Sequence, residues 1–345
     1  MIRRFAHALR PTRFRTVALA LLGVIIGAAC DNSNDPLAIS EPTDPPEVAA
    51  SSPAPAFATV SYTGLPYGPI GLWSSATTVE WGPAPFTGTQ NYADAGGVVT
   101  QINSARSKKQ RLILAMTGGP STRYTTNGKF DMTKWKSKQN TFNTSTIRNA
   151  IAAGVADGTV IGNQLIDEPE TPRWGGTVSK AVIDQMATYA KSMFPSLPMG
   201  INVGPPAYKN WRTSETFKVL DYELFQYNHY VTAGNIGAWR DAVLSRARAD
   251  GVTPAFSLNI LNGGVQDHTG SWDCPGTGGK GTRVPNCRMT ADQVKNWGLA
   301  IGTAGCAMQM WRYDDAFMAK SANQDAFRAV ASLLSSKPRR SCRRP

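Results

Sequence analysis

The 345-residue chain is poor in charged residues and in histidine. Asp, Glu, Lys and Arg make up 17% of it, below the quarter usual for globular proteins, and it has three histidines. It has no H-E-x-x-H, Walker A or G-x-S-x-G sequence, and His229 and His268 lie far apart. We therefore expect no zinc site, no other cofactor and no esterase-type nucleophile. With 41% hydrophobic and 9% aromatic residues, a disordered, collagen-like or coiled-coil chain is excluded.

The net charge of +12 is concentrated at the two ends of the chain. Residues 1–29 carry five Arg and no acid, residues 30–58 carry five acids and no base, and residues 336–345 carry five bases. The bases of residues 59–335 are scattered and form no basic stripe. We therefore expect no nucleic-acid partner.

The first 30 residues predict an export signal. A basic start leads into Val17–Ala29, 13 mostly apolar residues that are too short to span a bilayer and end in small residues before Cys30. The string Ile26-Gly-Ala-Ala-Cys30 resembles a bacterial lipoprotein signal, in which the Cys is acylated, although Gly27 stands where that family usually has Leu. The resemblance implies a cell-envelope protein held to a membrane by a lipid on Cys30. Ordinary cleavage, giving a periplasmic or secreted protein, is the alternative.

Composition divides the remaining chain into three parts. Residues 30–58 are rich in Pro, Ser, Ala and acids without an apolar period, which predicts a disordered tether. Residues 59–335 form one domain, which we expect to be monomeric, and residues 336–345 form a basic tail. In an oxidising compartment, Cys274 and Cys287 would close a Gly-rich loop as a disulfide. Cys306 and Cys342 either form a second bridge, or Cys306 is simply a small buried strand residue.

Short apolar runs alternate with amphipathic segments through residues 59–335. The predicted strands are Ile70–Trp73, Thr78–Trp81, Arg111–Met116, Thr159–Ile166, Met199–Val203, Leu220–Tyr227, Pro254–Ile260 and Cys306–Trp311. The predicted helices are Ala93–Lys108, Asn143–Ala156, Lys180–Phe194, Trp211–Lys218, Gly237–Asp250, Thr290–Leu299 and Asn323–Leu334. This alternation indicates an α/β protein with a parallel sheet.

A single (β/α)8 TIM-like barrel fits this pattern better than a doubly wound sheet. Such a barrel takes about 250 residues. The only G-x-G-x-x-G, residues 276–281, lies between two cysteines and follows no predicted strand, so it is not a dinucleotide-binding turn. Only four residues separate the first two predicted strands, which makes the first β/α unit irregular or one of its strands miscounted.

Polar, amide and aromatic residues follow the predicted strands, where a barrel carries its active site. Such a surface suits sugars, whose hydroxyls need hydrogen bonds and whose C–H faces pack on aromatic rings. The expected substrate-binding residues are Asp167, Glu170, Asn202, Gln226, Tyr227, His229, Asn259 and Trp311.

Glu168 is the strongest catalytic candidate. Pro169 is expected to keep Glu168 extended at the rim of the barrel. Crowding with Asp167 and Glu170 disfavours simultaneous ionisation and would raise at least one pKa toward that of a useful general acid. The alternative is that these acids cap the next helix or pair with Arg173.

The string Asp167-Glu168-Pro169 resembles the Asn-Glu-Pro-like motif of the large retaining clan of (β/α)8 glycoside hydrolases. In that clan the motif ends the fourth strand and carries the acid/base Glu, and Trp311 stands where a Trp platform often ends the eighth strand. The chain departs from the clan at the seventh strand, where Phe256–Asn262 has no acid for the nucleophile. Two carboxylates are the usual minimum for glycoside hydrolysis. The best partner is Asp314, and the other candidates are Asp315, Asp267, Asp167 and Glu170.

The sequence thus predicts an exported, membrane-tethered glycoside hydrolase that cleaves a poly- or oligosaccharide. Glu168 would be the general acid and Asp314 the second carboxylate. Two alternatives stay open. One is a non-catalytic, glycan-binding surface lipoprotein on a degenerate barrel, and the other is a polysaccharide lyase with Tyr227 or His229 as base.

Overall fold

The structure, a computed structural model, describes residues 61–72, 85–204, 215–229, 235–264 and 287–345. The chain divides into two units, Met1–Pro55 and Ala56–Pro345, and every described residue belongs to the second. The predicted signal, Cys30 and the whole predicted tether lie outside the described residues, as do Asp267 and Cys274.

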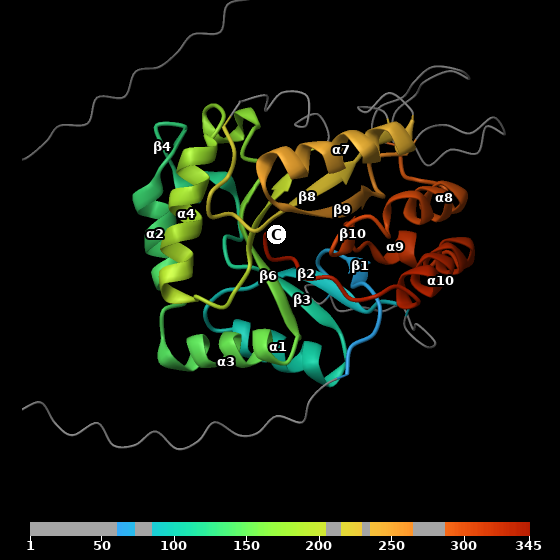
Figure 1. Cartoon of the computed structure of the whole chain (residues 1–345), viewed down its shortest axis with the longest axis horizontal. Coiled ribbons are helices and arrows are strands. Elements are labelled where there is room, and N and C mark those ends of the chain that lie inside the picture. Colours follow the sequence, from blue (N-terminus) through green and yellow to red (C-terminus); the bar gives the residue numbers. More distant parts are fainter. Residues whose placement is uncertain (1–60, 73–84, 205–214, 230–234, 265–286) are drawn as a thin grey trace, which may run out of the picture. The chain divides into compact units, whose positions relative to one another are not determined.

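Eight parallel strands form the centre of the second unit (Figure 1). Their order in the sheet is β1 (Tyr67–Pro69), β10 (Met308–Trp311), β9 (Thr253–Asn259), β8 (Tyr222–Tyr227), β7 (Met199–Val203), β6 (Val160–Asp167), β3 (Arg111–Ala115) and β2 (Gly88–Tyr92). Two backbone hydrogen bonds join the edges, from Thr87 N to Tyr67 O (2.9 Å) and from Gly71 N to Gln90 O (2.8 Å). The sheet closes, and the predicted (β/α)8 barrel is confirmed.

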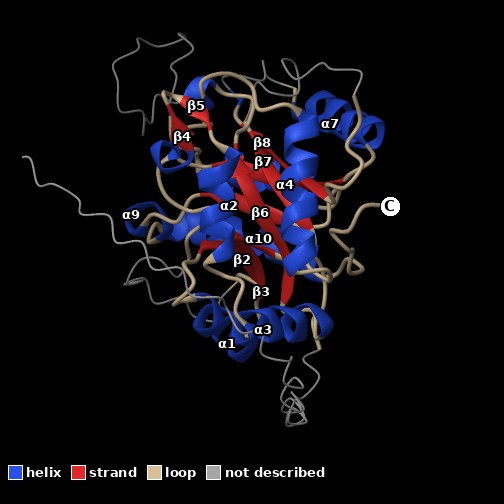
Figure 2. Ribbon diagram, turned by 90° about the vertical axis from the view of Figure 1, so that its left-hand side faces the viewer, coloured by secondary structure: helices blue, strands red, loops and turns tan. Residues whose placement is uncertain are grey.

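Helices surround the strands (Figure 2). They are α1 (Val98–Ser107), α2 (Met132–Asn140), α3 (Ser145–Ala156), α4 (Lys180–Met193), α7 (Ile236–Asp250), α8 (Ala291–Ile301), α9 (Asp315–Met318) and α10 (Ser321–Ser335). A small hairpin, β4 (Thr125–Thr126) and β5 (Lys129–Phe130), and 3-10 turns at Ser121–Tyr124 and Pro172–Trp174 complete the described part of the unit. Among the helices that the structure describes, none is both long enough and apolar enough to cross a membrane.

Local sequence explains where several helices begin. Thr290 and Gln293 form a capping box at the start of α8, each side chain accepting a hydrogen bond from the other residue's backbone N–H. Ser179 caps α4, and Asp131 caps α2 with bonds from two backbone N–H groups. The periodicity of α2 is weak, and the sequence did not indicate this helix.

Tyr222 fills the barrel near the amino ends of the strands. An added Cβ at Gly162 or Gly200 would lie 2.7 Å or 2.2 Å from the Tyr222 ring, so both positions need glycine. Further along the strands, the inward-facing residues become polar, because side chains alternate along a strand and register aligns them between strands. Gln226, Ser257 and Gln309 lie at one level of the register and are all buried. The interior is therefore apolar at one end and rich in amides at the other.

The first β/α unit is irregular, as expected, and its strands differ from those predicted. We predicted the first strand at Ile70–Trp73, but the structure has it three residues earlier, as β1. The second predicted strand, Thr78–Trp81, lies outside the described residues. The second strand is Gly88–Tyr92, a polar segment without the apolar run that would have revealed it. The helix predicted at Trp211–Lys218 is wrong for the described part, because residues 215–218 are not helical.

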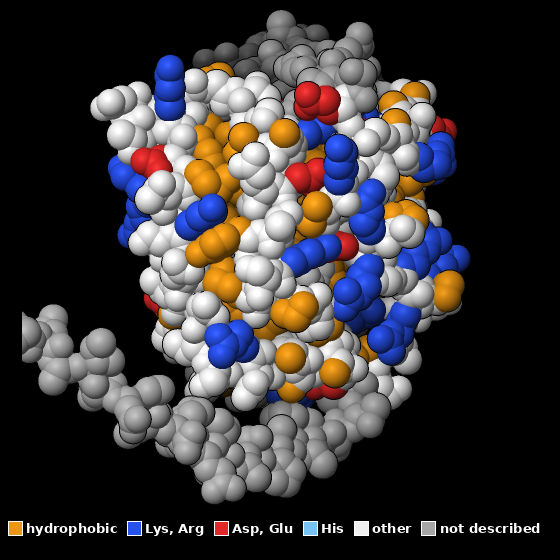
Figure 3. Space-filling view, turned by 60° about the vertical axis from the view of Figure 1, so that its left-hand side comes forward, with side chains coloured by type: hydrophobic (Ala, Val, Ile, Leu, Met, Phe, Trp, Pro, Cys, Tyr) orange, Lys and Arg blue, Asp and Glu red, His pale blue; other side chains and the backbone are white. Residues whose placement is uncertain are grey.

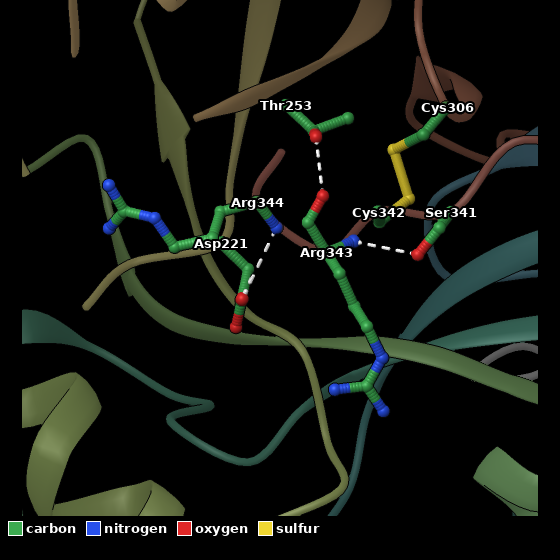
Figure 4. Close-up of a disulfide and its surroundings, with 7 residues drawn as sticks. All are labelled: Asp221, Thr253, Cys306, Ser341, Cys342, Arg343 and Arg344. Atoms are coloured by element: carbon green, nitrogen blue, oxygen red, sulfur yellow. Dashed lines mark hydrogen bonds between the residues drawn. A yellow bond between two sulfur atoms is a disulfide. The ribbon is translucent and has the colours of Figure 1, made fainter. Parts of the chain in front are cut away.

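The basic C-terminal residues run across the amino ends of the strands. Lys and Arg side chains are spread over the face shown in Figure 3 and gather toward its right-hand side, with few acids. The Cys306–Cys342 disulfide, with Cα atoms 5.3 Å apart, fixes residues 336–345 to the barrel (Figure 4). The bridge left open by the sequence is thus present. Cys287 is buried and disulfide-bonded, but the predicted Cys274–Cys287 pair stays a prediction because Cys274 lies outside the described residues.

Candidate active site at the carboxyl end of the barrel

Two acids at the end of β6 share one arginine. Arg173, on the 3-10 turn Pro172–Trp174, donates from Nη1 to Asp167 Oδ2 at 2.7 Å and from Nη2 to Glu168 Oε2. The Arg173 side chain is 42% exposed, whereas that of Glu168 is 18% exposed. The pairing considered as an alternative from sequence is therefore present. Because the arginine is the most exposed of the three, a ligand entering from solvent would meet it first.

A β-bulge in β6 aims Asp167 into the barrel. Gln164 aligns with Gly200 of β7, but Asp167 aligns with Asn202, so β6 holds one extra residue. Asp167 Oδ1 accepts hydrogen bonds from Gln164 Nε2 and Asn202 Nδ2, both at 3.2 Å, and Gln90 Nε2 donates to Gln164 Oε1 at 2.7 Å. A chain of amide side chains thus supports this carboxylate from inside the barrel.

The backbone of Glu168 differs from the prediction. We expected Pro169 to keep Glu168 extended, but its φ is +46°, in the left-handed region that a glutamate rarely adopts. Its N–H donates to Asn202 O at 2.9 Å, and Trp174 Nε1 donates to the carbonyls of Asp167 (3.0 Å) and Glu168 (3.1 Å). These bonds hold a turn that costs free energy, a feature often found at functional sites.

The surroundings raise the pKa values of two neighbouring carboxyl groups, those of Glu168 and Glu170. Burial, and secondarily Asp167, raises the pKa of Glu168, while Arg173 opposes the rise. Burial raises the pKa of Glu170 to about 7, although Gly204 N–H donates to its Oε1 at 2.8 Å. A Cβ on Gly204 would lie 2.7 Å from Glu170 Oε1 and 3.3 Å from Glu168 Cδ, so these two atoms lie within about 6 Å of each other. Two titratable groups with raised pKa values therefore adjoin at this rim.

Two aromatic side chains lie at the same rim. Tyr92, at the end of β2, is 45% exposed, and burial of part of the residue, followed by Asp167, raises its pKa to about 12. Trp311 ends β10, and the Arg312 guanidinium lies 5.6 Å from the centre of its ring. The positive charge of Arg312 partly opposes the rise in the pKa of Tyr92. Both aromatic residues therefore lie near the same arginine.

The predicted amide residues point into the barrel. Asn202, Gln226 and Asn259 are all less than 10% exposed, and Asn259 Oδ1 accepts from Asn262 N at 3.1 Å. Some neighbouring polar atoms lack a partner among the described residues; these are Gln90 Oε1, Asn202 Oδ1, Ser257 Oγ and both side-chain polar atoms of Gln309. They can bind water or a hydroxyl group below the carboxylates.

Tyr227 and His229 lie on the helix side of β8. Tyr227 is fully buried, packs edge-on against Trp239 (5.0 Å) and Trp297 (5.3 Å), and its hydroxyl is 2.6 Å from His229 Nδ1. The His229 ring stacks on Trp297 at 4.7 Å. This placement gives Tyr227 a packing role, whereas the expected sugar contact of His229 stays a prediction.

Asp314 serves as a helix cap. Its Oδ1 accepts from Phe317 N at 2.9 Å at the start of α9, and among the described residues no hydrogen bond or ion pair joins it to Glu168. The end of β9 carries Asn259 and no acid. The part of the chain that the structure describes also holds no group of three His, Cys, Asp or Glu side chains arranged to bind a metal.

A groove of about 860 Å³ lies on the helix flank, between α2, α4 and residues 215–219. Its lining includes two acids, Asp184 and Glu215. Asp184 accepts hydrogen bonds from the backbone N–H groups of Lys218, Val219 and Leu220, at 2.6 Å, 3.0 Å and 3.0 Å, so this carboxylate fixes the loop. The carboxyl groups at the rim are the better candidates despite the size of the groove.

The sequence missed Tyr92 at the rim and several polar residues of the barrel interior beneath it. Tyr92 and Gln90 belong to the unpredicted strand β2, and Ser257 and Gln309 are single polar residues within apolar runs. The alternation of small or polar residues with apolar ones in Ala255–Asn259 was the signal that could have revealed Ser257.

No family model and no curated protein matches the sequence. Among solved structures, a chitinase from Rhizomucor miehei is 11% identical, with a TM-score of 0.43 over 75% of this chain and 99% of its own. A thermostable xylanase mutant from Cellvibrio japonicus is 12% identical, with a TM-score of 0.45 over 78% and 98%. A putative alpha-L-fucosidase from Bacteroides thetaiotaomicron is 10% identical, with a TM-score of 0.44 over 83% and 99%. Likenesses of this size carry no conclusion about activity, and the barrel assignment rests on the strand order.

Proposed function

We propose that the chain is a glycoside hydrolase whose active site is the rim at the end of β6. The observation that carries the proposal is the Asp167–Glu168 pair, bridged by the exposed Arg173 and placed at the end of the fourth barrel strand. Buried amides lie beneath the pair, and the exposed ring of Tyr92 and the ring of Trp311 lie at the same rim. Acid, hydrogen-bonding and aromatic groups of this kind are what cleavage and binding of a sugar chain require.

Glu168 is the general acid in this proposal. Its pKa is raised by burial and by Asp167, and Arg173 is the group that favours its ionised form. A sugar that displaces Arg173 would remove this opposing charge and raise the pKa of the carboxyl group further. Glu168 then gives the proton to the glycosidic oxygen as the C–O bond breaks, and the leaving sugar departs as an alcohol.

Asp167 is the preferred second carboxylate. It faces the barrel interior, and three side chains donate hydrogen bonds to it. A carboxylate held in this way can stabilise the positive charge that develops on the sugar ring, or activate water. Asp314 is the competing candidate, and its cap to α9 is the reason for ranking it second. Asn202, Gln226, Asn259 and Trp311 would bind the saccharide.

A polysaccharide panel tests this proposal. The wild-type chain should release new reducing ends from at least one glycan without forming ultraviolet-absorbing unsaturated products, which a lyase would form. Glu168→Gln should lower the rate by about 10²–10⁴-fold, the usual contribution of a positioned acid. Cleavage by this variant at the wild-type rate would contradict the role of Glu168.

A non-catalytic glycan-binding protein is the second candidate, favoured by the absence of an acid at the end of β9. It predicts that wild type and Glu168→Gln bind a glycan equally while neither cleaves it. Affinity electrophoresis in gels containing each polysaccharide separates the two functions. Retardation of both proteins without product would support binding alone.

We also propose that the protein is exported and anchored through Cys30. The support is the sequence of residues 1–30, with its basic start, short apolar run and small residues before Cys30. Wild type should partition into the detergent phase of a cell-envelope extract, and Cys30→Ser should partition into the aqueous phase. An aqueous wild-type protein would point to ordinary signal cleavage.

A further inference from the structure

A polar hollow lies at the end of the barrel opposite the carboxylates. It has a volume of about 420 Å³ and is formed where β3 and β6 begin and where residues 339–343 cross them. Its described lining includes four arginines, Arg111, Arg339, Arg340 and Arg343, and no Asp or Glu. Four like charges around one hollow repel one another unless an anion joins them.

Arg111 is the buried member of this set. It is 2% exposed, and its Nη2 donates to the carbonyls of Thr63 (3.1 Å) and Gly64, while its Nε has no partner among the described residues. Burial, and secondarily Arg339, lowers its pKa to about 10, so the guanidinium is still charged at neutral pH. The structure thus holds a buried cation that no carboxylate of the described residues neutralises.

The other three arginines come from the C-terminal segment, which is fixed in place. The Cys306–Cys342 disulfide holds it, Thr253 Oγ1 donates to Arg343 O at 2.6 Å, and Arg344 N donates to Asp221 Oδ1 at 3.3 Å (Figure 4). Arg340 Nη1 donates to Thr303 O at 2.8 Å. Arg343 Nη2 donates to Ser196 O. Arg340 and Arg343 thus bond backbone carbonyls, which do not compensate their positive charge.

We propose that this hollow binds a phosphate group. Guanidinium groups pair with phosphate oxygens through two parallel hydrogen bonds, and a phosphate ester carries about −1.5 to −2 charges at neutral pH, whereas a carboxylate carries one. The volume falls within the range of about 300–1,000 Å³ that small-molecule sites occupy, so an organic group attached to the phosphate also fits. The group belongs either to a soluble phosphate or to the headgroup of an anionic phospholipid.

Titration calorimetry of the full chain with inorganic phosphate, at constant ionic strength in potassium chloride, tests the soluble source. Arg339→Gln/Arg340→Gln removes two exposed lining charges and should weaken binding at least tenfold. Arg148→Gln/Arg328→Gln removes the same net charge from exposed positions on α3 and α10, outside the hollow, and should stay within twofold of wild type.

Co-sedimentation with phosphatidylglycerol or phosphatidylcholine vesicles tests the lipid source. If a headgroup is the ligand, the wild-type chain should prefer the anionic vesicles, and only the variant of the hollow should lose that preference. Phosphate binding or vesicle preference that depends on Arg339 and Arg340 supports the site and identifies the source. Absence of both, or an equal loss in the two double variants, would overturn the proposal.

Discussion

The two ends of the barrel differ in charge, strain and covalent support. The carboxyl end carries Asp167, Glu168 and Glu170, a residue at positive φ, and the exposed ring of Tyr92. The amino end carries arginines and a disulfide, with Tyr222 filling the interior beside it. Barrels commonly place function at the first end and stability at the second. The difference indicates that the acidic groups and the strained backbone lie at one end, and that covalent support lies at the other.

The largest effect on stability is expected when the disulfide at the amino end is removed. Cys306→Ser/Cys342→Ser should lower the free energy of unfolding by about 2–4 kcal/mol, because the bridge closes a loop with a sequence separation of 36. Denaturant unfolding measures this loss, and hydrolysis at low temperature should be unchanged. A loss of activity in the still-folded variant would break the division between the two ends.

A smaller effect is expected from Glu170 and depends on pH. Its folded-state pKa of about 7 lies above the ordinary value, so the stability linked to its proton is present at low pH and is lost as pH rises toward and through 7. Glu170→Gln keeps the acceptor for Gly204 N–H but does not titrate. The melting temperature of this variant, relative to wild type, should therefore rise from pH 5 to pH 8.

Buried Glu223 also titrates in this range, since burial raises its pKa to about 8 and Glu170 adds to the rise. Glu170→Gln should therefore also lower the pKa of Glu223, which favours the variant at high pH in the same direction. A difference that stays constant between pH 5 and pH 8 would show that Glu170 is ionised at neutral pH.

The steric cost of the positive φ at Glu168 should be measurable as a difference in the free energy of unfolding between two variants. Glu168→Ala and Glu168→Gly both remove the side chain and its ion pair, but only glycine adopts φ of +46° without a steric cost. The glycine variant should be more stable than the alanine variant by about 1 kcal/mol, as judged by chemical denaturation. Equal stabilities would mean that the rim stores no backbone strain.

Asp314→Asn should have the smallest effect. Asparagine caps a helix about as well as aspartate, so the melting temperature should change little. Hydrolysis should stay within about twofold of wild type if Asp167 is the second carboxylate. A loss of more than about 100-fold would instead make Asp314 the second carboxylate.

The sequence predicted the barrel because its later strands are apolar runs separated by amphipathic helices. It failed at β2, where Gly88–Tyr92 is polar and is stabilised by pairing with β3 rather than by its own hydrophobic pattern. The position of Glu168 at the fourth strand end was predictable from its motif. Its backbone conformation was not, because the bulge in β6 depends on pairing with β7.

The sequence also could not predict which side chains of a strand point into the barrel. Tyr227 and Gln226 are neighbours at the end of β8, yet one packs against helices and the other points into the barrel. Alternation predicts that they face opposite sides but not which of them faces inward. That choice is set by the barrel as a whole, in which Tyr222 and Leu224 already occupy the interior.

The disulfide also changes the topology of the last part of the barrel, from β10 onward. Between Cys306 and Cys342 the chain is a closed ring that contains β10, α9 and α10. If α10 detaches from the barrel, it stays tethered at both ends and at a high effective concentration, so reattachment is an intramolecular event with little entropy to recover. The final helix can therefore open locally without being lost from the barrel.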